Sequence, residues 1–114
     1  MKIAIIHCRK SSEVCTGAGC INAFNKKSSS FEQYKGIETE LCAFMDCGGC
    51  NIDRKTHKGM IEKMDRLKSM NVDKIHIGVC INEKCPHFIN IIEMLDRYKI
   101  VYEFGTHPTS SKKK

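Results

Sequence analysis

Short apolar runs alternate with longer amphipathic segments along the chain. Four of the short runs predict strands, at residues 2–8, 39–47, 74–80 and 100–104. The first of them, KIAIIHC, is a β-rich run of the kind expected for a buried strand. Polar residues and glycines follow each run, so the strands are expected to be short and separate.

The segments between these runs carry helical spacing. Residues 56–70 place Met60, Met64 and Leu67 on one face, and charged side chains cover the rest of the predicted helix. Residues 16–31 repeat apolar side chains at intervals of three. A further helix is predicted where Pro86 suits the first turn, with apolar residues turned inward after it.

This alternation predicts an α/β fold. Strands separated by helices form βαβ units with right-handed connections, which give a parallel sheet. We expect a small three-layer α/β/α sandwich with a mainly parallel four-stranded sheet. With 114 residues the chain is long enough for one core. We expect one domain over residues 1–108 and a polar, lysine-rich, disordered tail at 109–114.

Composition is ordinary for a globular domain, with 41% hydrophobic and 28% charged residues. No apolar run approaches the ~20 residues that a membrane-spanning helix needs, and the N-terminal run is too short for an export signal. We therefore expect a cytoplasmic protein without a membrane partner. The net charge of +6 includes three lysines at the end of the tail. No basic stripe interleaved with aromatic residues is present, so the charge does not predict nucleic-acid binding.

Cysteine is the residue type that departs from ordinary usage, at 8 of 114 positions. In a secreted chain this count would indicate disulfides, whereas in a reducing compartment it indicates metal ligands or redox thiols. Cys8, Cys47 and Cys80 end three predicted strands, Cys50 follows three residues after Cys47, and His107 follows the fourth strand. Four more candidates lie near the starts of the following helices: Cys15, Cys20, Cys85 and His87. Because parallel strands end at one edge of a sheet, we expect these nine side chains to gather there.

Thiolate sulfur selects Zn²⁺, Cu(I) or iron–sulfur clusters over magnesium and calcium. Cys47 and Cys50 have the spacing of a chelating pair, and the two glycines between them allow a sharp turn and leave amides free for the sulfurs. Cys85, at a helix start, is expected to have a lowered thiol pKa. With Cys80 and His87 it forms a second cluster, and the two clusters can complete a four-coordinate site. Zinc is the expected metal, with an iron–sulfur cluster as the alternative.

Two other functions remain open at the level of sequence. The spacing of Cys47 and Cys50 also serves thiol–disulfide enzymes, with Cys80 or Cys85 as a resolving partner, although glycines between the cysteines favour a loop over a helix start. The second of these functions is that of a small interaction module, in which the metal shapes a binding surface. No motif of a hydrolase, kinase or dehydrogenase is present. Cys42 and His76, both within predicted strands, are expected to be a small core residue and a hydrogen-bonded structural histidine.

The order and spacing of the cysteines make residues 2–107 of this chain resemble the CGGC-domain family. The features that carry the resemblance are Cys47-Gly48-Gly49-Cys50 in mid-chain, Cys8 and Cys80 after the first and third strands, Cys15-x4-Cys20, Cys85-Pro86-His87 and Gly105-Thr106-His107. The resemblance implies metal binding, with zinc as the metal, by the central pair and the flanking cysteines and histidines. It implies no reaction and no substrate, and Cys42 has no place in the pattern.

Overall fold

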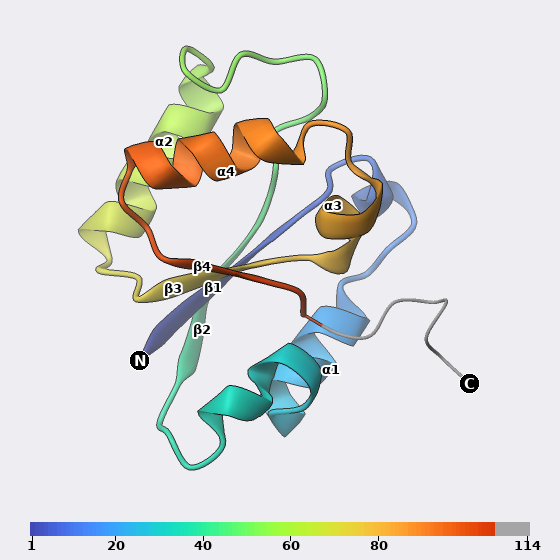
Figure 1. The fold of residues 1–114 in the computed structure, drawn as a ribbon, viewed down its shortest axis with the longest axis vertical. Coiled ribbons are helices and arrows are strands. Elements are labelled where there is room, and N and C mark those ends of the chain that lie inside the picture. Colours follow the sequence, from blue (N-terminus) through green and yellow to red (C-terminus); the bar gives the residue numbers. More distant parts are fainter. Residues whose placement is uncertain (107–114) are drawn as a thin grey trace.

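A four-stranded parallel sheet forms the centre of the molecule (Figure 1). The computed structural model describes residues 1–106, with the backbone alone described at position 12 and positions 82–84. The elements in chain order are β1 (Lys2–His7), η1 (Ser11–Glu13), α1 (Ala18–Lys26), η2 (Ser29–Tyr34), β2 (Glu40–Asp46), α2 (Lys58–Ser69), β3 (Lys74–Ile77), α3 (Val79–Lys84), α4 (Phe88–Arg97) and β4 (Tyr102–Phe104). The strand order is β2-β1-β3-β4 with every pair parallel, so the predicted α/β class and parallel sheet are confirmed.

Helices cover both faces of this sheet. Helices α2 and α4 lie on one face, and α1 with the 3-10 helix η2 lies on the other (Figure 1). Strand β1 explains the division, because its side chains alternate between the two faces. Ala4 and Ile6 pack with the helices α2 and α4, while Ile3 and Ile5 pack with α1 and η2. All four side chains are fully buried, which is why β1 is apolar without interruption. None of the helices in the described part of the chain is long and apolar enough to cross a membrane.

The third strand is shorter than the sequence predicts. β3 ends at Ile77, and α3 begins directly after Gly78, whose N–H donates to the carbonyl of Ile6. The prediction that Cys80 ends the strand is therefore wrong, since Cys80 lies in the first turn of α3. The run Ile77 to Ile81 has strand-like composition, but Ile81 is fully buried against the core only because the chain turns into a helix.

The first predicted helix is also shorter than expected. α1 ends at Lys26, because Lys27 adopts a left-handed conformation with φ of 52°. The N–H groups of Lys27 and Ser28 donate to the carbonyls of Phe24 and Ala23, which closes the helix. The segment that follows forms η2, and its buried Phe31 and Tyr34 complete the core on that face.

The strand order places the site-bearing loops. From β1 the chain reaches β2 on one side and later β3 on the other, so the carboxyl ends of β1 and β3 flank the point where the connections diverge. Doubly wound sheets bind ligands at this point. The loop after β1 and the start of α3 therefore meet at a position suited to a site.

His76 is a structural histidine, as the sequence predicts. It is fully buried, with Nε2 2.7 Å from the Tyr34 hydroxyl oxygen and Nδ1 2.9 Å from the carbonyl oxygen of Gly105. A carbonyl can only accept, so Nδ1 donates to Gly105 and Nε2 accepts from Tyr34. The ring thus connects η2 to the segment after β4. Burial lowers the pKa of His76 because it disfavours the charged imidazolium.

We predict that the free energy of unfolding falls as the pH is lowered below about 6.5, the ordinary histidine value. In that range the unfolded state binds a proton that folded His76 resists, so stability is lost on acidification, by at most about 1.4 kcal/mol per pH unit. Urea unfolding between pH 7 and pH 5 measures this slope. The variant His76→Gln should show a shallower slope than the wild-type protein, and equal slopes would contradict the assignment.

Candidate functional site

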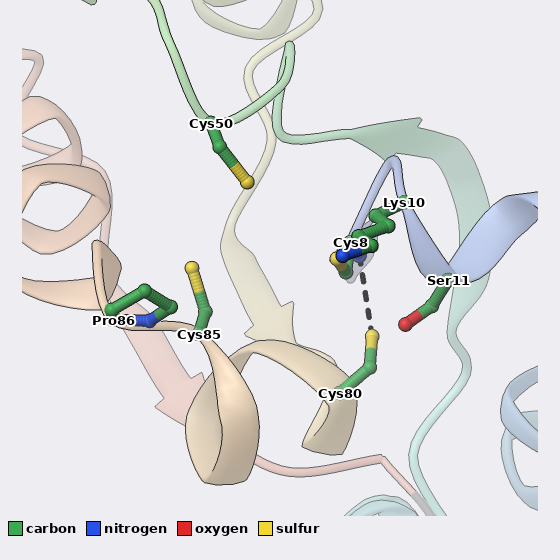
Figure 2. A pocket seen from close by; sticks show the side chains of 7 residues that line it. All are labelled: Cys8, Lys10, Ser11, Cys50, Cys80, Cys85 and Pro86. Carbon is green, nitrogen blue, oxygen red and sulfur yellow. Dashed lines mark hydrogen bonds between the residues drawn. The ribbon is translucent and has the colours of Figure 1, made fainter.

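Four cysteine side chains line one pocket at the carboxyl edge of the sheet (Figure 2). The pocket has a volume of about 460 Å³. Its lining residues are Cys8, Lys10, Ser11, Cys50, Cys80, Cys85 and Pro86. In Figure 2 the four sulfur atoms point into the same space, from the loop after β1, the loop after β2 and the two ends of α3. The predicted convergence at this edge is therefore observed for these four cysteines.

Cys8 and Cys80 connect the ends of the two central strands. Cys8 follows β1, and its backbone N–H donates to the sulfur of Cys80 in α3 over 3.2 Å. Burial raises the pKa of the Cys80 thiol, and this hydrogen bond offsets only part of the effect. The N–H group therefore orients the Cys80 sulfur toward the pocket without making it acidic.

Cys85 lies between α3 and α4, and its sulfur accepts a hydrogen bond of 3.3 Å from the backbone N–H of His87. Its pKa is raised, first by burial and then by the neighbouring Cys47, Cys8 and Cys50. The expectation that the start of a helix lowers this pKa is therefore wrong. Desolvation and a group of nearby thiols outweigh the single N–H donor. A metal bound here would have to displace the proton of this thiol.

The loop at residues 47–50 separates the two cysteines of its motif. Cys47 is 2% exposed and belongs to the core, whereas Cys50 is exposed and faces the pocket. Gly48 and Gly49 have φ values of 87° and 112°, a region that other residues rarely adopt. Gly48 has no room for a side chain either, since a Cβ there would lie 2.7 Å from the sulfur of Met60. The glycines thus allow the chain to bury one thiol and present the other.

A carboxylate holds the start of this loop. Asp46 Oδ1 accepts from the N–H of Gly48 over 2.8 Å and from the ammonium of Lys63 over 3.0 Å. Burial opposes ionisation of Asp46, but these two hydrogen bonds and the charges of Lys63 and Arg9 keep its pKa below the usual value. The Gly48 amide therefore binds a carboxylate and not a sulfur, contrary to the sequence expectation.

The other predicted ligands among the described residues lie outside the pocket lining. Cys20 is buried in α1 with its sulfur 3.1 Å from the Thr106 hydroxyl, and burial raises its pKa. Cys15 is exposed and accepts a hydrogen bond from the N–H of Gly17. His87 occupies the position before α4, and His107 lies outside the described residues.

Cys42 is not a core residue, contrary to expectation. It is half-buried at a register shift, where β1 residues Ile3 and Ala4 pair with Leu41 and Ala43 of β2. Cys42 is therefore the extra residue of the shift, and its thiol donates to the carbonyl of Ile3 over 3.4 Å. Cys42 belongs to neither core cluster.

The donor set fits a soft metal, whereas the side-chain positions do not form a closed site. Among the side chains that the structure describes, no three His, Cys, Asp or Glu residues lie close enough together to hold a metal ion. Tetrahedral zinc needs each sulfur at about 2.3 Å from the ion. Cys50 is the exposed member of the four and lies beside two glycines, so it has the greatest freedom to close such a site.

Sequence reasoning missed the residues that surround these thiols. Lys10 and Ser11 line the pocket, and Arg54 is buried beneath the loop at residues 47–50. Nothing in the sequence distinguishes an arginine in a polar segment from an ordinary surface arginine. The position of Lys10 and Ser11 directly after Cys8 is the one signal that could have placed them near the site.

We predict that Gly48→Ala destabilises the protein more than Gly36→Ala. Both glycines have positive φ, so both changes carry the left-handed cost of roughly 1–2 kcal/mol. A Cβ at Gly36 meets nothing within 4 Å, while one at Gly48 collides with Ile52 and Met60. Gly48→Ala should therefore cost about 1–3 kcal/mol more, as overpacking does. Urea unfolding of the two variants measures the difference, and equal losses would contradict the close packing of the loop.

Comparison with known proteins identifies the family of the chain. The sequence matches the CGGC domain over residues 2–107. It is 36% identical over 118 residues to the uncharacterized protein MJ0582 of Methanocaldococcus jannaschii, covering 94% of this chain and 87% of that protein. No solved structure gives a significant match. The chain belongs to the CGGC domain family.

Proposed function

We propose that this protein binds a metal, zinc in the first place, through the thiolates of Cys8, Cys50, Cys80 and Cys85. The observation that carries the proposal is the pocket itself, into which four cysteines from two loops and the two ends of α3 direct their sulfur atoms. Soft thiolate ligands select zinc or iron–sulfur clusters among the metals available to proteins. The element bound is an outcome of the test below, because the same four thiols suit both centres.

The surroundings of the thiols support a binding role. The N–H groups of Cys8 and His87 donate to two of the four sulfurs, which orients these sulfurs as outer-shell donors orient metal ligands. Four thiolates would close the coordination shell of zinc, and the bound ion would then stabilise the fold where the loops meet. The role proposed for the metal is therefore structural or storage, with Lewis-acid chemistry only if one thiolate stays unbound.

The geometry gives less support to a thiol–disulfide enzyme. Such an enzyme needs an accessible attacking thiol with a lowered pKa. Cys47, the first cysteine of the motif, is 2% exposed. The pKa values of Cys80 and Cys85 are raised, mainly by burial. A raised pKa keeps these two thiols neutral over a wider pH range, which disfavours nucleophilic attack, whereas a metal can still displace the proton of a neutral thiol.

We predict that Cys50→Ser weakens zinc binding by at least about 100-fold, because loss of an outer-shell partner alone costs 10–100-fold. Cys50 is exposed, so the change should leave the fold intact. Cys42→Ser is the matched control, as this half-buried thiol lies in β2 and does not line the pocket. Anaerobic competition with a chromophoric chelator measures the affinity, and visible absorption after reconstitution with iron and sulfide detects a cluster.

Two results would contradict the proposal. One is a reduced wild-type protein that binds neither zinc nor an iron–sulfur cluster. The other is equal affinity of the Cys50→Ser and Cys42→Ser variants, which would place the metal at other residues.

A further inference from the structure

An arginine is buried beneath the loop at residues 47–50. Arg54 is 5% exposed, although it comes from a polar segment. Its Nε donates to the carbonyl of Cys47 over 3.1 Å, and its Nη2 donates to the carbonyl of Gly49 over 2.6 Å. Arg9, which follows Cys8, donates to the carbonyl of Gly48 over 3.4 Å. Three successive carbonyls of the loop thus accept from guanidinium groups.

Among the side chains that the structure describes, no carboxylate forms an ion pair with the buried guanidinium of Arg54. Ion pairs are formed by Lys35 with Glu32, Lys63 with Asp46 and Lys74 with Glu103, and none of these three involves Arg54. Asp46, the acidic residue at the start of the loop, is occupied by Lys63 and by the amide of Gly48. Arginine remains charged at every physiological pH, and a buried charge is costly unless an opposite charge compensates it. Neutral carbonyls satisfy its hydrogen bonds but leave its charge unbalanced.

The thiol pocket is where a compensating charge can form. The carbonyls that Arg54 binds belong to Cys47 and to the residue before Cys50, whose thiol lines the pocket. Cys85 lines the same pocket as Cys50 and packs against the core cluster that contains Cys47, so it also lies close to the loop. A divalent ion held by four thiolates carries a net negative charge, because the thiolates outnumber the charges of the ion. A divalent ion held by neutral histidines would not carry a net negative charge.

We infer that Arg54 is the counter-charge of a net-anionic metal–thiolate centre in this pocket, and that it also positions the loop carrying Cys50. The inference rests on the proposed function and extends it to the charge of the centre. Arg54 touches the loop backbone and acts through it, so it is a positioning residue and not a ligand. Its charge favours a centre with a full set of thiolates over one completed by neutral ligands.

The test compares Arg54→Gln and Arg54→Lys with the exposed Arg66→Gln as control. Glutamine keeps an N–H donor for the loop and loses the charge, whereas lysine keeps the charge and loses the two-pronged geometry. Zinc affinity is measured by chelator competition, and unfolding by urea is measured with and without zinc. We expect Arg54→Gln to weaken zinc binding about 10–100-fold, as loss of outer-shell partners does, and Arg54→Lys, which keeps the charge, to weaken it less.

The comparison of metal-free and zinc-loaded protein separates charge from packing. Ligand binding stabilises the folded state in proportion to the logarithm of affinity, so Arg54→Gln should lose part of the stabilisation by zinc. A purely structural role would lower the stability of both forms equally and leave the zinc affinity unchanged. That result would overturn the inference.

The remaining outcomes distinguish failure of the inference from failure of the proposed function. If Arg54→Gln does not fold, Arg54→Lys carries the test, and a loss of affinity as large as that of Cys50→Ser would overturn the role of charge. If the wild-type protein binds no metal, the proposed function fails and the inference fails with it. If wild type binds zinc, Cys50→Ser does not, and Arg54→Gln binds as tightly as Arg66→Gln, the inference alone fails.

Discussion

The parallel pairing of β1 with both β2 and β3 determines where the pocket cysteines lie. β1 is buried on both faces and occupies an inner position of the sheet. β2 lies on one side of β1, and β3 lies on the other. The carboxyl ends of β1 and β3 are consequently adjacent, and the hydrogen bond from the N–H of Cys8 to the sulfur of Cys80 spans them. Were β1 and β3 not paired with each other, at least one further strand would separate these two cysteines.

The loop at residues 47–50 completes the pocket through a second constraint, which is backbone conformation. The chain leaves β2, buries Cys47 in the core, and reverses through two glycines with positive φ so that Cys50 faces the pocket. Asp46 binds the first amide of this reversal, and the guanidinium groups of Arg54 and Arg9 bind its carbonyls. The loop is therefore fixed by polar contacts at its backbone, which leaves the Cys50 side chain available for a ligand.

The sequence predicts the sheet and the convergence of cysteines because both follow from the positions of apolar runs along the chain. Strand ends are marked by apolar runs, and parallel strands end at one edge, so Cys8, Cys50, Cys80 and Cys85 could be placed together. The direction of helical side chains is less visible. Cys20 has the same chemistry as these four, but α1 turns it into the core against Phe24 and Phe31, where its thiol meets Thr106.

Three further features are not visible in the sequence: the early end of β3, the burial of Arg54 and the raised pKa of Cys85. β3 ends at Ile77 and α3 begins at Val79, but the residues around this point have the composition of a strand. The sequence therefore predicts a strand where α3 begins. Arg54 follows a loop of polar residues and carries no mark of the carbonyls that it binds. The raised pKa of Cys85 likewise depends on neighbours that are distant in sequence, whereas only its place at a helix start is visible locally.

The central claim is that four cysteine sulfurs bind one metal centre at the edge of the sheet. X-ray absorption at the zinc edge of the zinc-loaded protein tests it most directly, because it reports the type, number and distance of the ligand atoms. The account predicts a shell of four sulfurs at about 2.3 Å. A shell dominated by nitrogen or oxygen at about 2.0–2.1 Å would contradict it.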